Sequence, residues 1–481
     1  MQTAPKITCI RSADWIAAWD GKAGRHVYLR NGDVAFQGDR IVHVGGRYEG
    51  PVATEIDGRR RFVMPGLINV HNHPANMPSF RGVREELGNV NFYQSGLYDG
   101  RTAFAADDVD RPWNALLAFT EMLRSGVTTY VDMSFPYPGW IDAVAKSGLR
   151  AYLAPLYESQ HWHVPNAYTL TYRPEADRGR RAFADAMAVI DAAEAHPSGR
   201  MMGMVAPMAI DTCDADLLVD SLAEARRRQR PIQLHAGEAV MEFLEMTRRH
   251  GKTQVQWLKE IGFLAEGVTI GHGLFLGHHS WLSWDFREDI DILAEAGVSV
   301  AHCPTPFSRY GITMESFGGY VRAGINMGIG TDTHPHNMIE EMRTAIIMSR
   351  VTERRISGGR TLDVFNAATI GGARILHRDD LGRLAPGAKA DIVLIATDDN
   401  WMLPVYDPLR CLVFTAADRA VRDVFVDGTK VLDGGRVVGF DAMEAAQNVQ
   451  RMQDYGARRA AERDHSGRRA EEIAPTTLPM G

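Results

Sequence analysis

Short apolar segments that each end in a side chain able to bind a metal recur along the middle of this chain. Five of them follow one another in order, at residues 65–73, 231–235, 268–272, 298–302 and 325–332. Helix-like runs, such as Trp113–Arg124 and Asp214–Arg228, alternate with these strand candidates. The alternation predicts an α/β fold with a parallel β-barrel over residues 64–376, in which the ends of successive strands meet at one face.

The two ends of the chain are rich in short β-segments. Strand candidates separated by Gly-Asp or Asp-Gly turns lie at residues 34–44, 390–395 and 421–438. We therefore expect residues 1–63 and 377–440 to pair into one domain. Residues 441–481 begin with a helical stretch and finish in a polar tail, which predicts a docked helix followed by a loose end.

Charge and cysteine usage exclude several classes of protein. The chain has 53 Lys and Arg against 60 Asp and Glu, a net charge of −7, and no long basic block. This balance argues against nucleic acid or a membrane surface as the main partner and leaves small molecules. Its 4 cysteines show no C-x-x-C spacing, and no apolar stretch is long enough for a membrane span. We expect an unprocessed, soluble cytoplasmic protein.

The strongest local signal is a pair of histidines at the first of the five strand ends. Alternate side chains of a strand share a face, so His71 and His73 point the same way. Neutral imidazole is the commonest protein ligand of zinc and also suits iron. A lone H-x-H pair is common by chance, and His161-Trp162-His163 is a second instance in this chain. Five ligand-type strand ends in order are much harder to obtain by chance, and barrel enzymes keep their active sites at that face.

Further motifs accompany these strand ends. They are Arg81-Gly82, the run Glu121–Thr129 before a strand that reaches Asp132, His235 with Glu238, His302-Cys303-Pro304, Gly330-Thr331-Asp332 and the segment Leu381–Asp391. With them, nearly the whole chain resembles the metal-dependent amidohydrolase superfamily. The resemblance is greatest to the branch of triazine hydrolases and cytosine and guanine deaminases, and it extends to phenylurea and thiocarbamate herbicide hydrolases. It implies a distorted (β/α)8 TIM barrel with a composite β-sandwich formed by both chain ends.

The resemblance also implies a metal site. One divalent metal ion would be bound by His71, His73, His235 and Asp332, with water as the remaining ligand. Zinc is the expected ion, although iron, manganese or cobalt would suit the same ligands. Relatives with two metals bridge them with a lysine on the fourth strand, and residues 205–211 contain no lysine. We therefore expect a single ion.

Catalytic roles follow from the same resemblance. Asp332 would also take the proton of the attacking water, and His272 would orient that water or polarise the substrate. Glu238 would shuttle a proton to a ring nitrogen or to the leaving group. His302 either contacts the substrate or is packed at the end of its strand.

The loops expected around the barrel mouth are rich in aromatic residues, histidine and methionine. These residues are Met77, Phe80, Phe92, Tyr93, Tyr98, Phe135, Tyr137, Trp140, His161, Trp162, His163 and Phe307. Such a lining suits a flat or aromatic substrate, and packing of the loops on one another is the alternative for each residue. His161 and His163 are candidate substrate-binding residues. No arginine cluster suggests phosphate or carboxylate recognition, which argues against a nucleotide or dipeptide. We expect His334 and His336 to be exposed in a loop, and a role in binding metal or substrate is the alternative.

Together these features predict a metal-dependent hydrolase that uses an activated water to cleave a C–N bond in a small, flat or aromatic nitrogen compound. This is the deaminase or amidohydrolase type of reaction. Hydrolysis of a urea, carbamate or anilide carbonyl is the alternative, and a non-catalytic scaffold is a remote one because every ligand is present. A dinucleotide enzyme has no support, since no Gly-x-Gly-x-x-Gly follows a strand. Relatives are often homo-oligomers, so we expect one here.

Overall fold

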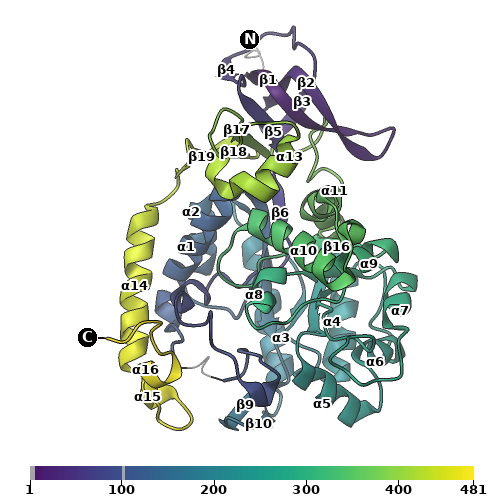
Figure 1. The fold of residues 1–481 in the computed structure, drawn as a ribbon, viewed down its shortest axis with the longest axis vertical. Helices are drawn as coiled ribbons and strands as arrows, with labels where there is room; N and C mark the ends of the chain where they lie inside the picture. Colours follow the sequence, from purple (N-terminus) through teal and green to yellow (C-terminus); the bar gives the residue numbers. More distant parts are fainter. Residues whose placement is uncertain (1–5, 100–102, 481) are drawn as a thin grey trace.

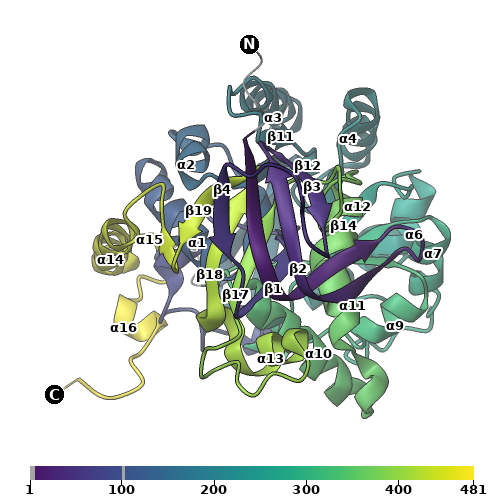
Figure 2. The same cartoon turned by 90° about the horizontal axis from the view of Figure 1, so that it is seen from above.

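Both ends of the chain contribute to one nine-stranded sheet in the computed structural model, which describes residues 6–99 and 103–480 (Figures 1 and 2). The N-terminal strands are β1 (Ile7–Asp20), β2 (Arg25–Gln37), β3 (Arg40–Val44), β4 (Thr54–Asp57) and β5 (Arg61–Pro65), and the C-terminal strands are β17 (Ile392–Ala396), β18 (Val421–Val426), β19 (Thr429–Asp433) and β20 (Arg436–Val437). The strand order is β20-β19-β18-β17-β5-β1-β2-β3, with β4 paired to β1. The two ends therefore pair as expected, whereas the two-layered sandwich and the domain boundaries stay predictions.

The turn between β18 and β19 shows how the local sequence determines one hairpin of this sheet. Val426 pairs with Thr429, so only Asp427 and Gly428 connect the two strands. Both connecting residues have positive φ, 48° and 72°. A two-residue hairpin of this kind needs that conformation, and Asp-Gly is one of the pairs that adopt it with least strain.

Two parallel sheets make up the middle of the molecule. The first contains β6 (Leu67–Asn69), β7 (Val127–Ser134), β8 (Arg150–Tyr157), β11 (Met201–Gly203) and β12 (Ala206–Pro207), and the second contains β13 (Ile232–Ala236), β14 (Val268–His272), β15 (Ser299–His302) and β16 (Asn326–Ile329). The orders are β11-β8-β7-β6, with β12 on β8, and β13-β14-β15-β16. Isolated parallel bridges connect the sheets at both seams, Asn72 to Asp332 and Val205 to Ile232. The fold is thus α/β and barrel-like, with the hydrogen-bonded ladder interrupted at the seams.

Helices follow most of the parallel strands and cover the sheets. They are α1 (Arg111–Arg124), α2 (Trp140–Ser147), α3 (Arg178–Glu194), α4 (Ala215–Arg228), α5 (Val240–His250), α6 (Gln254–Glu260), α7 (Asp289–Glu295), α8 (Pro304–Ser308), α9 (Phe317–Arg322), α10 (Met338–Glu353), α11 (Thr361–Asn366) and α12 (Gly372–Ile375). Both helices expected by name, at residues 113–124 and 214–228, are present. Asp214 caps α4, because its side chain accepts a hydrogen bond from the Leu217 amide at 2.8 Å.

The remaining elements are short or lie at the periphery. They are the hairpin β9 (Gln160–Asn166) and β10 (Thr169–Pro174), α13 (Pro408–Cys411), α14 (Ala442–Arg458), α15 (Ala460–Arg463), α16 (Ala470–Ile473), the 3-10 turns η1 (Pro78–Phe80), η2 (Val90–Phe92), η3 (Asp108–Asp110), η4 (Ile356–Gly358) and η7 (Ala417–Ala420), and the π turns η5 (Ala367–Gly371) and η6 (Leu412–Ala416). The expected C-terminal helix is α14, which lies along α1 (Figure 1). Within the described residues, no helix combines the length and apolarity needed to cross a bilayer.

Candidate active site

Five predicted site residues converge where the parallel strands end. His71 and His73 follow β6, His235 lies in β13, His272 ends β14 and Asp332 follows β16. The Nε2 atoms of His71 and His73 lie 3.6 and 3.3 Å from Oδ1 of Asp332. The Nε2 atom of His235 is 3.3 Å from Nε2 of His73, and the His272 ring centroid is 4.4 Å from that of His71. The strand-end pattern in the sequence therefore corresponds to one cluster in space.

The opposite nitrogen of three of these rings contacts an acceptor. Nδ1 of His71 meets Oε1 of Gln233, Nδ1 of His73 meets the carbonyl of Met133, and Nδ1 of His235 meets the carbonyl of Met208. A carbonyl can only accept, so each Nδ1 carries the proton and each Nε2 presents a lone pair to the cluster. This is the tautomer that a metal ligand needs.

The charges in the cluster suit a cation. Burial lowers the pKa of His71, His235 and His272 below the usual value, which keeps these rings neutral. Burial opposes ionisation of Asp332, but its contacts with the His71 and His73 rings hold the pKa of this carboxyl well below its usual range. The cluster therefore combines neutral imidazoles with one carboxylate, which is a ligand set typical of zinc.

The spacing of the ligand atoms fits a metal ion as well. Two overlapping groups, His71 with His235 and His272, and His71 with His73 and Asp332, each have ligand atoms within 4.8 Å of one another. For bonds of about 2.1 Å the edge of a coordination tetrahedron is about 3.4 Å, close to the 3.3 to 3.6 Å between the atoms here. Nε2 of His71 and both ring nitrogens of His272 are buried and lack a hydrogen-bond partner among the described residues. A bound ion, or a water molecule next to that ion, would provide partners for these nitrogen atoms.

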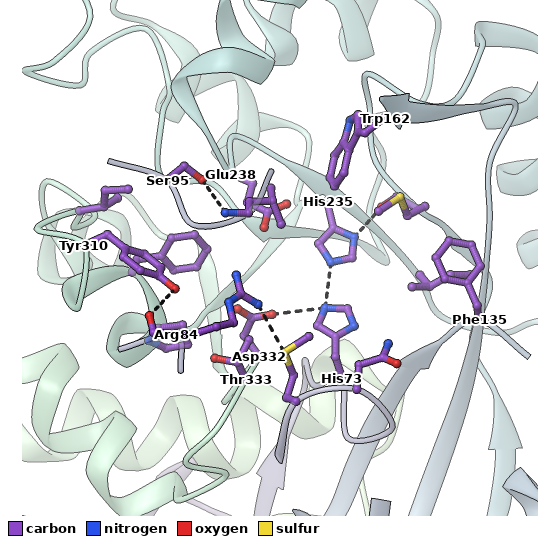
Figure 3. A pocket seen from close by; sticks show the side chains of 18 residues that line it. His73, Arg84, Ser95, Phe135, Trp162, His235, Glu238, Tyr310, Asp332 and Thr333 are labelled. Atoms are coloured by element: carbon purple, nitrogen blue, oxygen red, sulfur yellow. Dashed lines mark hydrogen bonds and ion pairs between the residues drawn. The ribbon is translucent and has the colours of Figure 1, made fainter. Parts of the chain in front are cut away.

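A cavity lies beside the cluster, and Figure 3 shows its side chains. Its polar lining includes His73, Arg84, Ser95, His235, Glu238 and Asp332, and its apolar lining includes Met77, Leu97, Phe135, Trp162, Met208 and Phe307. Four of the residues expected around the barrel mouth, namely Met77, Phe135, Trp162 and Phe307, thus face this cavity. Others pack between elements, such as Tyr137 and Trp140 in the main core.

Glu238 reaches this cavity from the loop between β13 and α5. The loop is fixed by Glu242, whose carboxyl oxygens accept hydrogen bonds from the amides of Gly237 and Glu238 at 2.8 and 2.9 Å. Burial and the nearby Asp211 raise the pKa of Glu242 to about 8. Glu238 therefore lines one cavity with His73, His235 and Asp332, and Glu242 holds the loop that carries Glu238.

The structure places the other predicted site residues outside this cavity lining. His302 is buried, its ring stacks on Phe317 with 5.7 Å between centroids, and burial lowers its pKa to about 3. His161 and His163 lie on β9 and line a neighbouring cavity, which shares the wall residues Leu97, Phe135, Trp162 and Met208 with the first. Contact of these three histidines with substrate stays a prediction.

The expectation that His334 and His336 are exposed is wrong. His334 is 3% exposed and His336 is 0% exposed. Nε2 of His334 lies 2.9 Å from Oε1 of Glu85, and the amide of His336 donates to Oε2 of Glu121 at 2.9 Å. These acids come from segments far away in the sequence, and they draw the loop after Asp332 inward.

Gln233 is a residue of this site that the sequence analysis missed. It is fully buried, contacts Nδ1 of His71, and donates to the carbonyl of Val70 at 2.9 Å. One signal could have identified it. Gln233 lies two residues before His235 on the same strand, so the period of two places both side chains on one face.

Comparison with known proteins agrees with this geometry. The model of the family described as "Amidohydrolase family" matches residues 62–431. A 5-methylthioadenosine/S-adenosylhomocysteine deaminase of Thermococcus kodakarensis is 32% identical over 411 residues, which cover 84% of this chain and 90% of the relative. The solved triazine hydrolase of Arthrobacter aurescens superposes with a TM-score of 0.79 at 22% identity, covering 93% of this chain and 99% of that one. An adenosine deaminase of Xanthomonas campestris with bound zinc gives 0.76 at 22%, covering 94% and 99%. The chain belongs to the amidohydrolase family.

Proposed function

We propose that this protein is a metal-dependent hydrolase that removes an amino group from an sp2 carbon of a small, flat nitrogen compound and releases ammonia. The observation that carries the proposal is the convergence of His71, His73, His235 and Asp332 beside a cavity that Glu238 also lines. The deaminase relative from Thermococcus kodakarensis supports the reaction class. The apolar and aromatic lining supports a flat substrate.

A single divalent ion, zinc, is part of the proposal. His71, His73, His235 and Asp332 would hold it, and the zinc in the adenosine deaminase of Xanthomonas campestris supports the choice of metal. When bound, such a cation lowers the pKa of water from about 16 to about 7, so that hydroxide is available at neutral pH.

Three side chains of this chain would then move protons or orient the reacting groups. Asp332, ionised in the cluster, accepts the proton of the attacking water. The ring nitrogens of His272 have no partner among the described residues, so one of them hydrogen-bonds to that water or to the substrate. Glu238 delivers a proton to a ring nitrogen, and the proton taken up by Asp332 passes to the departing amino group. The hydroxyl proton of the addition product then returns to Glu238, so that ammonia leaves and a carbonyl remains.

The proposal extends to architecture and cellular context. We propose that the two parallel sheets form a distorted (β/α)8 barrel, supported by the bridges at both seams, and that both chain ends form a composite β-sandwich. We propose further that the protein is a cytoplasmic homo-oligomer. All four cysteines are free thiols, which supports a reducing compartment.

The test is a substrate panel with separate detection of released ammonia and released amine, run on zinc-loaded enzyme of measured metal content. The panel contains aminopurines, aminopyrimidines and aminotriazines, each with and without a carboxylate, together with adenosine derivatives, phenylureas, carbamates and anilides. We expect ammonia from an aminoheterocycle and about one zinc per chain. Release of amine from the carbonyl substrates alone, or no turnover of any member, would refute the proposal.

Glu238→Gln tests the proton transfer. General acid-base catalysis contributes roughly 100-fold or more, so we expect kcat for the aminoheterocycle to fall at least about 100-fold while zinc content stays the same. Glu245→Gln on α5 is the matched control. Glu245 pairs with Arg248 and Arg249 outside the cavity, and its variant should keep the activity of the unmodified enzyme. An equal loss in both variants would contradict the role of Glu238.

A further inference from the structure

Arg84 is a buried cation in the wall of the candidate substrate cavity. It is 7% exposed, and Figure 3 shows its side chain among those that line the cavity. Nη2 donates to the carbonyl of Gly96 at 2.9 Å, and Nη1 contacts the sulfur of Met77 at 3.7 Å. Nε is buried without a hydrogen-bond partner. No carboxylate of the described residues forms an ion pair with this guanidinium.

A buried arginine without a paired anion destabilises the protein when no ligand is bound. A buried charge is normally paired, because burial removes the water that would otherwise solvate it. Two other arginines of this region have carboxylate partners: Arg81 pairs with Glu121 at 2.7 Å, and Arg111 pairs with Asp108 at 2.9 Å. Arg84 differs, and the space in front of it is the cavity itself. We therefore expect the anion that pairs with Arg84 to be part of a ligand bound in the cavity.

A second donor lines the same cavity as the guanidinium. Ser95 precedes Gly96, whose carbonyl Arg84 binds, and Ser95 also lines the cavity. Its hydroxyl oxygen accepts a hydrogen bond from the Leu97 amide at 3.1 Å, which leaves the hydroxyl proton available for donation. A guanidinium and a hydroxyl that line one cavity are both donors for the oxygens of a planar carboxylate.

We propose that Arg84, assisted by Ser95, binds a carboxylate carried by the substrate. The substrate class would then be nitrogen-containing aromatic acids, with the ring held by the apolar wall and the carboxylate directed away from the histidine cluster. This inference rests on the proposed function for the identity of the cavity as the substrate site. It makes Arg84 a specificity residue, and it departs from the expectation that the site does not recognise a carboxylate.

A structural role for Arg84 makes a different prediction. Its hydrogen bond to Gly96 ties the two ends of the segment 84–96 together, and its removal could loosen that segment. The main chain of Arg84 is held independently, because the Tyr310 hydroxyl donates to the Arg84 carbonyl at 3.2 Å. A loosened segment would weaken the binding of every ligand. Loss of an anion site would weaken only the binding of ligands that carry an acidic group.

Calorimetric titration of the zinc-loaded enzyme with benzoate and with benzamide separates these roles. The two probes share a ring and differ in charge, and neither requires turnover, so the result does not depend on the reaction class. We expect benzoate to bind at least about tenfold more tightly than benzamide. Arg84→Met should remove that preference and leave benzamide binding and the melting temperature unchanged, and Arg84→Lys should keep part of it.

Arg111→Met is the matched control, since it removes a cation from the neighbouring cavity only, and it should keep the preference for benzoate. Benzoate could also bind through the zinc ion. In that case Arg84→Met would bind benzoate as well as the unmodified enzyme does, and this result would overturn the proposal. Equal weakening of both probes, or equal affinity of both for the unmodified enzyme, would overturn it too.

Discussion

Gln233 orients one of the cluster histidines, His71, through its side chain. His73 and His235 are oriented by main-chain carbonyls, of Met133 and Met208, which side-chain substitutions leave in place. His71 instead depends on the Gln233 side chain. Groups that orient a ligand in this way typically contribute 10- to 100-fold to metal affinity.

Gln233→Met should therefore weaken zinc binding by about 10- to 100-fold, since methionine fills the same space without a strong acceptor for Nδ1 of His71. Competition with a chromophoric chelator measures the affinity directly. Gln450→Met, on the exposed side of α14, serves as the control and should bind zinc as the unmodified protein does. Unchanged affinity in the Gln233 variant would show that His71 needs no orienting partner.

Sequence reasoning located the cluster well because strand ends carry positional information. Once the strands are parallel, His71, His235, His272 and Asp332 must lie at one face, whatever the loops do. The burial of His334 and the position of Arg84 had no such local signal. Both depend on contacts between separate loops, such as His334 with Glu85, and no spacing rule links residues 249 positions apart.

At the scale of elements, the contact between β2 and α11 depends on a partly buried histidine. His26 lies edge-on to Trp19 and to Phe365, with ring centroids 5.1 and 4.9 Å away. Its Nε2 is 3.3 Å from the hydroxyl of Thr369. Burial, helped by the charge of Arg383, lowers the pKa of His26 from 6.5 to about 4. The folded protein therefore holds this ring neutral at pH values where the unfolded chain would protonate it.

This difference makes stability depend on pH. A depressed histidine pKa means that the unfolded state binds the proton more tightly, so the contribution of His26 is complete above pH 6.5 and declines as the pH falls toward 4. At pH 5 the loss is about 2 kcal/mol. In His26→Gln this loss should be absent, so urea unfolding at pH 7.5 and pH 5 should show a smaller decrease for the variant. Equal decreases in both proteins would contradict the assignment.

Elements were predictable where their hydrophobic pattern was regular. The buried parallel strands and the amphipathic helices α1 and α4 follow the sequence pattern closely. The hairpin β9–β10 was not expected, because its residues are partly or fully exposed and show no buried face to read. Strand β1, Ile7–Asp20, was also missed, since a shift in its pairing with β2 between Ile10 and Ala13 interrupts the alternation.

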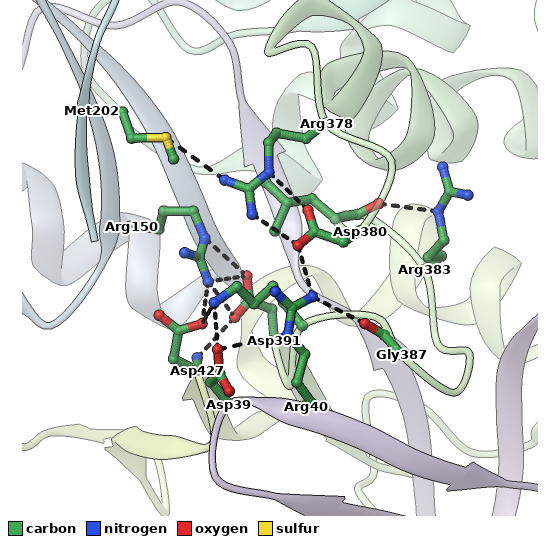
Figure 4. A network of polar contacts seen from close by, with 12 residues as sticks. Asp39, Arg40, Arg150, Met202, Arg378, Asp380, Arg383, Gly387, Asp391 and Asp427 are labelled. Atoms are coloured by element: carbon green, nitrogen blue, oxygen red, sulfur yellow. Dashed lines mark hydrogen bonds and ion pairs between the residues drawn. The ribbon is translucent and has the colours of Figure 1, made fainter. Parts of the chain in front are cut away.

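At the scale of the whole molecule, the nine-stranded sheet is joined to the barrel-like part by a buried charge network (Figure 4). Arg150 opens β8, and its Nη2 lies 3.1 Å from Oδ1 of Asp391 and 2.6 Å from Oδ1 of Asp427. The side chains of Arg150 and Asp391 are 1% and 4% exposed. Asp391 precedes β17, and Asp427 lies in the turn after β18. One arginine thus connects the parallel sheet to two points of the sheet built from the chain ends.

Because burial is nearly complete, breaking this network should cost far more than breaking a surface pair. Arg150→Met leaves the Asp391 carboxylate buried without a cation, and changes of this kind destabilise proteins by about 3–5 kcal/mol. We expect a corresponding loss in the free energy of unfolding, measured by urea denaturation at pH 7.5. The double variant Arg150→Met with Asp391→Asn should recover part of the lost stability, because the buried unpaired charge is then absent.

Arg59→Met is the control. It breaks an exposed pair with Asp57 at 2.8 Å and should unfold at the same urea concentration as the unmodified protein. If the two single variants unfolded alike, the two sheets would be held together by their apolar contacts alone.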